Sequence, residues 1–229
     1  MKIGGLQRIS LIDYPGYICA IIFSQGCNFK CPYCHNPELV DRDMFRTAIN
    51  ENDVIEFLES RKGKLDAVTL CGGEPTMQSD VISFIKKIKK MGFAVKLDTN
   101  GSLPQVIKAL LDEQLIDYVA MDVKAPLDKY KDIVKTPVNQ DSIRESIQFI
   151  LKAKIPHEFR TTLVQSQLDE DDILQIGKMI NGASHYVLQN FIPTKTLDKK
   201  FTREKSFPDE KLQQIKNQLE QQIPTVTIR

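Results

Sequence analysis

Short apolar runs alternate with amphipathic segments from about residue 17 to about residue 192. Such runs are typical of parallel strands that are buried on both faces. They predict six strands, at Tyr17–Ser24, Ala67–Cys71, Phe93–Asp98, Tyr118–Val123, His157–Val164 and Tyr186–Ile192. Repeated strand–helix units of this kind predict an α/β fold, because right-handed crossovers join successive parallel strands.

Between the strands, apolar residues recur every three or four positions, which predicts helices with one apolar face each. These residues are Val54, Ile55 and Leu58; Val81, Ile82, Ile85 and Ile88; Val106, Ile107, Leu110 and Leu111; Ile143, Ile147, Ile150 and Leu151; Ile173, Ile176 and Ile180; and Leu212, Ile215 and Leu219. The flanking residues agree: Gly92 follows the second helix and Pro104 opens the third. Ser142 and Glu145 have the spacing of a capping box, and Thr225–Ile228 is a candidate final strand.

Six strand–helix units are compatible with an open doubly wound sheet or a partial barrel, and are too few for a closed eightfold barrel. In either arrangement, ligands bind at the C-terminal ends of the strands. The segment 193–208 is polar and basic, and we expect it to be a mobile surface segment. We therefore expect a core domain at 1–192, with the basic linker and C-terminal helix of 193–229 packing on the same domain.

Composition and charge exclude several classes of protein. The chain has 229 residues, of which 41% are hydrophobic, and its 31 Lys and Arg balance 30 Asp and Glu. This balance provides no overall field for nucleic acid or for an anionic membrane. The longest apolar run near the start, Ile18 to Phe23, is too short to span a bilayer. We expect a soluble cytoplasmic protein with neither a membrane nor a nucleic-acid partner.

Three of the five cysteines, Cys27, Cys31 and Cys34, lie within eight residues in a loop directly after the first predicted strand. This is a poor disulfide framework for a chain of this length and indicates metal binding in a reducing compartment. Structural zinc takes four ligands, whereas a four-iron cluster bound by three thiolates keeps one iron open to an external ligand. Spacing alone favours the iron–sulfur cluster, but a zinc site completed by Cys71 or His35, or buried cysteines without metal, remain alternatives.

The spacing Cys-x3-Cys-x2-Cys, with Tyr33 before the last cysteine, resembles the signature of the radical S-adenosylmethionine (SAM) superfamily. The words Gly5-Leu6-Gln7, Asp13-Tyr14-Pro15-Gly16 and Cys34-His35-Asn36-Pro37 further resemble glycyl-radical-enzyme activating proteins. Among these, the chain is most similar to the type that activates anaerobic ribonucleoside-triphosphate reductase. The resemblance covers the chain to about residue 192.

This resemblance implies a partial (βα)6 TIM-type barrel of parallel strands, with outer helices and a short C-terminal extension. It implies a [4Fe-4S] cluster on Cys27, Cys31 and Cys34 that reductively cleaves SAM to methionine and a 5′-deoxyadenosyl radical, which then abstracts hydrogen. The protein would shield and aim that radical. The implied partners are a glycyl radical enzyme, which is anaerobic ribonucleotide reductase for the most similar type, and a low-potential electron donor such as flavodoxin or ferredoxin.

Short polar motifs follow several predicted strands, at the C-terminal ends where ligands bind. Two of them are Gly72-Gly73-Glu74 and Asp98-Thr99-Asn100. In the first, paired glycines let the backbone approach a ligand closely and a glutamate can accept from an ammonium group. It resembles the superfamily motif that binds the SAM amino group, and an ordinary Gly-Gly turn is the alternative. The second resembles a SAM-site word of activating enzymes, and an Asx turn is the alternative.

Asp122 and Lys124 share a face at the end of the fourth strand, because strand side chains alternate. The resemblance makes Lys124 a partner of the SAM carboxylate and places Asp122 near it, while a plain surface pair is the alternative. Arg160, in the fifth strand, either points inward, where a guanidinium requires an anionic partner, or keeps its head in solvent. The resemblance also places Tyr33 among the cofactor-binding residues.

Other polar residues near these positions have more than one interpretation. Gln189 or Asn190, at the sixth strand end, could contact adenosine. His35 either tunes the cluster through hydrogen bonds or forms a turn. We expect Cys19 and Cys71 to pack in strands rather than bind metal. Two other functions remain as alternatives: a radical SAM enzyme that acts on a small molecule or modified nucleoside, and a non-catalytic zinc-stabilised binding module.

Overall fold

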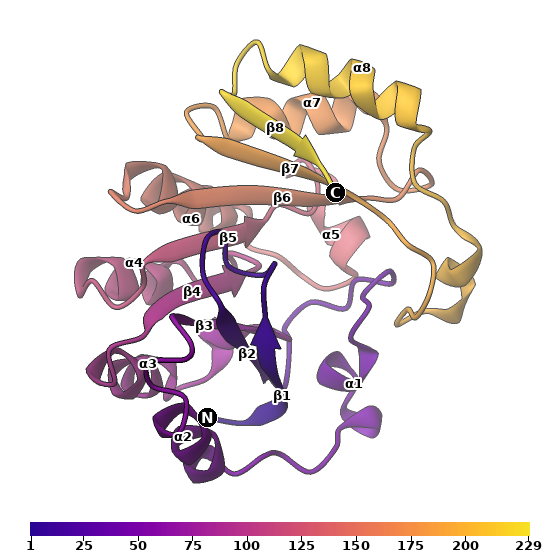
Figure 1. Cartoon of the computed structure of the whole chain (residues 1–229). Helices are drawn as coiled ribbons and strands as arrows, with labels where there is room; N and C mark the ends of the chain where they lie inside the picture. Colours follow the sequence, from indigo (N-terminus) through magenta and orange to yellow (C-terminus); the bar gives the residue numbers. More distant parts are fainter. The chain divides into compact units, whose positions relative to one another are not determined.

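The chain divides into two compact units in the computed structural model, which describes all 229 residues (Figure 1). The first unit comprises Met1–Asn28, Glu38–Thr99 and Gln105–Val119, and the second comprises Phe29–Pro37, Asn100–Pro104 and Ala120–Arg229. The positions of the two units relative to one another are not determined. The cysteine loop passes from the first unit, which contains Cys27, into the second, which contains Cys31 and Cys34.

Eight strands form one sheet, and their order in the sheet is their order in the chain. They are β1 (Ile3–Ser10), β2 (Cys19–Ser24), β3 (Ala67–Gly72), β4 (Ala94–Thr99), β5 (Tyr118–Asp122), β6 (His157–Leu163), β7 (His185–Asn190) and β8 (Thr225–Ile228). β1 pairs antiparallel with β2, whereas β2–β3, β3–β4, β6–β7 and β7–β8 are parallel pairs. β1 and β8 are the two ends of the order, so the sheet is not closed. The six predicted strands and the final strand are confirmed, and β1 is an additional one.

Eight α-helices accompany the strands: α1 (Pro37–Val40), α2 (Glu51–Glu59), α3 (Val81–Lys90), α4 (Pro104–Asp112), α5 (Tyr130–Val134), α6 (Gln140–Lys152), α7 (Glu170–Met179) and α8 (Asp209–Leu219). Three 3-10 helices lie at Arg42–Met44, Pro75–Met77 and Lys199–Arg203. As predicted, Gly92 follows α3, with a φ of 92°, and Pro104 is the first residue of α4. The predicted capping box is wrong: the Asn139 side chain caps α6 by accepting from the Asp141 N–H at 3.0 Å, so Ser142 lies inside the helix.

The first unit is built on β2, β3 and β4, in which most residues are buried. In the parallel register Ile22 lies beside Leu70, and Val68 lies beside Val95. Helix α3 buries one apolar face, formed by Val81, Phe84, Ile85 and Ile88. Because parallel strands end at the same edge of a sheet, the polar words after β3 and β4 meet at that edge.

The second unit contains β6, β7 and β8 together with α5 to α8. β8 lies beside β7, and α8 lies beside α7 (Figure 1). Two side chains of α8, Lys211 and Gln218, donate hydrogen bonds to Glu170 of α7. The segment 193–208 includes the third 3-10 helix, and its Lys205 carbonyl accepts from the Gln165 N–H at 2.9 Å. None of the helices has both the length and the hydropathy that crossing a membrane requires.

Candidate active site

The start of the cysteine loop is bonded to the turn that follows β3, within the first unit. The Gly73 N–H donates to the Ser24 carbonyl at 2.9 Å, and the Glu74 N–H donates to the Gly26 carbonyl at 2.8 Å. The Gly26 N–H in turn donates to the Leu39 carbonyl at 2.8 Å. Because Gly26 immediately precedes Cys27, these hydrogen bonds fix the position of the backbone from which Cys27 extends.

Gly72 and Gly73 are glycines because two stretches of backbone pack against each other here. A methyl group on Gly73 would lie 2.6 Å from the carbonyl carbon of Gly26 and 3.1 Å from the carbonyl oxygen of Leu39. Gly72 has a φ of 116°, which L side chains rarely adopt, and a methyl group there would lie 2.5 Å from the carbonyl oxygen of Ser24. The structure therefore shows a close approach of this turn to the end of β2 and the start of the loop.

Glu74 is fully buried and caps the 3-10 helix Pro75–Met77. One of its carboxylate oxygens, Oε1, accepts from the Thr76 N–H at 3.0 Å and from the Thr76 hydroxyl at 2.5 Å. The same oxygen accepts from the Thr99 hydroxyl at 2.8 Å. Three donors on one oxygen fix the direction of the side chain. The structure thus brings together Glu74 and Thr99, two predicted site residues that end different strands.

Asp98 pairs with a buried lysine that the sequence analysis did not select. Lys96 is 3% exposed and donates to Asp98 Oδ1 at 2.6 Å. Its ammonium nitrogen also lies 5.8 Å from the ring centre of Tyr118, a distance at which a cation is attracted to the ring. Residues two apart in a strand share a face, so a lysine two positions before Asp98 was a readable signal.

Cys31 and Cys34 begin and end a tight turn in the second unit. The Cys34 N–H donates to the Cys31 carbonyl at 3.0 Å, and Pro32 occupies the second position, where its fixed φ favours such a turn. A turn of this type holds its first and last Cα atoms within about 7 Å, so the two thiols start close together. Within each unit taken alone, no three His, Cys, Asp or Glu side chains are grouped closely enough to hold a metal ion.

The Cys31 thiol is buried close to a positive charge. Burial raises the pKa of the Cys31 thiol to about 11, while the Lys124 ammonium acts in the opposite direction and favours the thiolate. The Tyr33 hydroxyl is buried and has no partner at hydrogen-bond distance. A buried hydroxyl of this kind normally finds an acceptor. These groups therefore fit a cluster of thiolate and sulfide, which would supply negative charge and acceptors.

Asp122, Lys124 and Arg160 form one buried ion network. Arg160 Nε donates to Asp122 Oδ1 at 2.7 Å, and Lys124 Nζ donates to Asp122 Oδ2 at 2.9 Å. Although burial disfavours a charged carboxylate, Arg160 and Lys124 hold the pKa of Asp122 well below its usual range. Burial likewise opposes the charge of Lys124, but Asp122 keeps its pKa well above the ordinary value. The side chains are only 12–23% exposed, so neither the surface pair nor the solvated arginine considered from the sequence describes them.

The sequence profile of the radical SAM superfamily matches residues 21–179, which is more than half of the chain. The chain belongs to the radical SAM superfamily. A protein of Methanocaldococcus jannaschii that carries the provisional name glycyl-radical enzyme activating enzyme is 38% identical over 234 residues, which cover 99% of this chain and 95% of that protein. The pyruvate formate-lyase-activating enzyme of Staphylococcus aureus is 26% identical over 199 residues, which cover 82% of this chain and 78% of that enzyme.

Solved structures share the fold. SuiB of Streptococcus suis, bound to its precursor peptide SuiA, matches with a TM-score of 0.69 and 16% identity over 90% of this chain and 47% of SuiB. Coproporphyrinogen III oxidase of Escherichia coli, a radical SAM enzyme, matches with a TM-score of 0.62 and 12% identity over 92% of this chain and 54% of that chain. The predicted fold class, a partial TIM-type barrel, is confirmed. So is the expected class of enzyme, a radical SAM protein of the glycyl-radical activating family, whose superfamily uses a [4Fe-4S] cluster and SAM.

Other predicted residues of this radical SAM enzyme make local contacts. Asn100 accepts from the Ser102 N–H at 2.9 Å, which is the Asx turn considered as an alternative. The His35 ring stacks on Phe191, with ring centres 5.5 Å apart, and its Nε2 lies 2.9 Å from the Ile192 carbonyl. His35 therefore joins the cysteine loop to the segment after β7. In the same segment, the Asn190 amide oxygen accepts from the Ser206 hydroxyl at 2.9 Å.

The two cysteines outside the loop lie in strands, and neither is in a disulfide. Cys19, in β2, is buried and accepts from the Thr69 hydroxyl at 3.6 Å. Burial raises the pKa of its thiol, as it does for Cys31. Cys71, in β3, is half-buried and lies beside Phe23 in the parallel register.

A second buried network in the second unit was not predicted from the sequence. Glu158, 1% exposed, lies 3.9 Å from the Arg160 guanidinium, 3.5 Å from His185 Nδ1 and 3.3 Å from the Arg229 guanidinium. His185 Nε2 also lies 2.8 Å from the Thr227 hydroxyl. Glu158 and Arg160 are two residues apart in β6 and therefore lie on one face of the strand, so their spacing in the sequence could have indicated this pair.

Proposed function

We propose that this enzyme installs a glycyl radical on anaerobic ribonucleoside-triphosphate reductase, in the reducing cytoplasm. The observation that carries the proposal is the match over 99% of the chain to a glycyl-radical enzyme activating enzyme. The words around the cysteine loop and at Gly5-Leu6-Gln7 support the choice of partner, through their resemblance to the ribonucleotide reductase type. A low-potential carrier such as flavodoxin or ferredoxin would supply the electron.

We assign Cys27, Cys31 and Cys34 as the ligands of the cluster. The bound cluster supplies the electron that cleaves SAM. The chain contributes the arrangement of the thiols: Gly26 is bonded to the turn after β3, and the Cys31–Cys34 turn sets the other two. The ammonium of Lys124 favours the thiolate of Cys31. In this assignment the tight turn holds two of the three cluster ligands, Cys31 and Cys34, close together.

We assign Glu74 and Lys124 to the two ends of the amino-acid part of SAM. Glu74 is held rigidly by neutral donors and can accept from the SAM ammonium group. An ammonium group has three N–H donors, and Lys124 places one of them on Asp122, so the others can serve a carboxylate. Arg160 holds the other oxygen of Asp122 and keeps this lysine in place.

The other predicted residues complete the SAM site in this proposal. They are Tyr33, Gly72, Gly73, Asp98, Thr99 and Asn100. Thr99 orients Glu74 through its hydroxyl, and the two glycines hold that carboxylate's turn against the loop. Asp98 and Asn100 flank Thr99 at the end of β4, where hydroxyl groups of a ribose could reach them.

The activase proposal is tested by electron paramagnetic resonance after anaerobic reconstitution, reduction with dithionite in the presence of SAM, and mixing with the candidate reductase. We expect the doublet of a glycyl radical. Cys34→Ser should lose iron, acid-labile sulfide and the doublet, whereas Cys71→Ser should keep all three. Full iron in the first variant would refute the ligand assignment. SAM cleavage without a doublet would refute the choice of partner, and cleavage stimulated by a metabolite instead would support a small-molecule substrate.

The SAM-site assignment is tested by equilibrium binding of SAM to cluster-loaded protein. Glu74→Gln removes the anionic acceptor, and a charge-assisted hydrogen bond contributes about 1.5–3 kcal/mol, so we expect SAM to bind roughly 10–100-fold more weakly. The same change at Glu145, which is exposed on α6, is the matched control and should leave binding unchanged. Equal affinities for the two variants at equal iron content would contradict the assignment.

A further inference from the structure

The segment 191–205, which we call the strap, is bonded to the second half of the cysteine loop. The Leu197 N–H donates to the Cys34 carbonyl at 3.0 Å, and the Asp198 N–H donates to the Pro32 carbonyl at 2.9 Å. His35 adds its ring stack and its contact with the carbonyl of Ile192. The strap is therefore attached to the loop at Pro32, Cys34 and His35.

The strap gives this position a strong local positive charge. Residues 193–205 contain five basic and two acidic side chains, although the whole chain carries a net charge of only +1. The basic side chains are Lys195, Lys199, Lys200, Arg203 and Lys205, and all of them are exposed. Exposed Lys30 and Lys135 add two charges beside the loop and at the end of α5. Cations placed together in this way raise the local positive potential, which attracts negatively charged partners.

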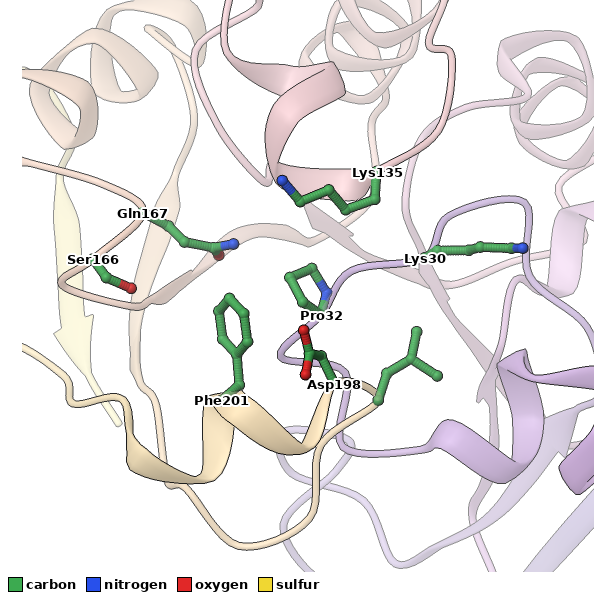
Figure 2. Close-up of a pocket in the computed structure, with 8 residues that line it drawn as sticks. Lys30, Pro32, Lys135, Ser166, Gln167, Asp198 and Phe201 are labelled. Atoms are coloured by element: carbon green, nitrogen blue, oxygen red, sulfur yellow. The ribbon is translucent and has the colours of Figure 1, made fainter.

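A hollow of about 570 Å³ lies between the strap and the loop. Its lining residues are Lys30, Pro32, Lys135, Ser166, Gln167, Leu197, Asp198 and Phe201. In Figure 2, Pro32 lies at the centre of the hollow, with Phe201 and Asp198 on one side and Lys135 on the other. Pro32 directly follows Cys31 and lies two residues before Cys34, so the hollow adjoins the segment that carries two of the proposed cluster ligands.

We propose that the strap and this hollow form the docking surface for an acidic protein that carries one electron to the cluster. This inference rests on the proposed function, because only a cluster that must be reduced requires such a partner. One electron leaves the reduced cofactor of the carrier and enters the cluster, and no bond or proton is exchanged in this step. The positive surface attracts an acidic partner, and the half-buried side chains of Phe201 and Leu197 offer the small apolar contact typical of transient redox complexes.

The experiment compares two double variants that change the net charge equally. Lys199→Glu with Lys200→Glu reverses two charges of the strap, while Lys152→Glu with Lys154→Glu reverses two exposed charges near the start of β6. Ser166 and Gln167 of the hollow follow the other end of β6, so its seven residues separate the control site from the hollow by about 20 Å. Neither pair belongs to the proposed cluster or SAM site.

The measured quantity is the rate of SAM cleavage as a function of the concentration of reduced flavodoxin. Because steering by opposite charges is strong at low salt, we expect the strap variant to need about tenfold more flavodoxin for half-maximal rate. At about 0.5 M salt the difference should shrink to less than about twofold, since exposed charges are then screened. The control variant should stay within about twofold of the unmodified enzyme at both salt concentrations. With dithionite in place of flavodoxin, all three proteins should cleave SAM equally fast.

The outcomes separate this inference from the proposed function. Equal flavodoxin dependence in the two double variants would overturn the docking surface. Slower cleavage with dithionite, accompanied by lower iron content, would assign the strap to folding of the loop and would also overturn it. A lower yield of glycyl radical from enzyme already reduced with dithionite would show that the strap binds the radical-accepting partner instead. If the unmodified enzyme cleaves no SAM with dithionite, the proposed function fails and not merely the docking surface.

Discussion

The contact between the Gly-Gly turn and the cysteine loop can be tested with a single methyl group. Gly73→Ala places a carbon atom 2.6 Å from the carbonyl carbon of Gly26 and 3.1 Å from the carbonyl oxygen of Leu39. Carbon atoms prefer a separation of about 3.5–4.0 Å, so the two backbones must move apart by roughly 1 Å. The obstacle is backbone rather than a flexible side chain, and the hydrogen bond from Glu74 to Gly26 lies between the same segments.

Two costs add in this variant. Overpacking a close-packed interior costs about 1–3 kcal/mol, and loss of the hydrogen bond from the Glu74 N–H costs about 1 kcal/mol more. We therefore expect the free energy of unfolding to fall by about 2–4 kcal/mol. The displaced residue, Gly26, directly precedes Cys27, so the variant should also bind less iron and sulfide per chain than the unmodified protein.

Chemical denaturation followed by circular dichroism under anaerobic conditions measures the stability, and iron and acid-labile sulfide analysis measures the cluster. Gly5→Ala is the matched control, because a methyl group there would lie 3.4 Å or more from the Phe23 side chain, an ordinary contact. We expect the control to be close to the unmodified protein in both measurements. If Gly73→Ala retains full cluster content and loses less than about 0.5 kcal/mol, the packing argument is wrong.

Two further predictions concern the second unit. Asp122→Asn leaves the cations of Lys124 and Arg160 without their shared carboxylate, so it should lower the free energy of unfolding by about 2–4 kcal/mol at pH 7. The control is Asp112→Asn, which removes one partner of an exposed ion pair and should change the free energy of unfolding by less than about 1 kcal/mol. Because the pKa of Asp122 is lowered by folding, this contribution is present above the unfolded-state pKa of about 3.9 and is lost as the pH falls below it, so the two curves should converge in acid. Burial lowers the pKa of His185, so this histidine binds a proton more readily in the unfolded chain than in the folded protein. The free energy of unfolding should therefore fall as the pH drops below about 6.5, the ordinary pKa of histidine. His185→Gln should remove that part of the pH dependence between pH 7 and 5, and an unchanged slope in denaturation measurements would exclude this assignment.

The pattern of apolar residues was enough to predict the parallel strands and most helices. Runs such as Ala67–Cys71 are buried on both faces, so their local composition carries the signal. β1 was missed because Ile3–Ser10 contains two glycines and exposed polar residues, and its pairing with β2 supplies what its composition lacks. The start of α6 was misplaced because Asn139 and Ser142 are both good capping residues, and the sequence does not say which one the chain uses.

The family and its cofactors could also be predicted from the sequence, because the residues that bind cofactors at a strand end occur in short motifs with fixed spacing. The cysteine loop and the word Gly72-Gly73-Glu74 are of this kind. Such words indicate the chemistry without showing which neighbours hold each side chain.

Those neighbours were decided by the tertiary structure. Glu74 meets Thr99, and Asp122 meets Arg160, because parallel strands bring residues from distant parts of the chain to one edge of the sheet. Gly72 is explained by the backbone of Ser24 and Gly73 by the backbone of Gly26, which no local pattern places beside them. A local pattern records how each segment is buried, but the partner of a charged or closely packed group depends on which other segment folds against it.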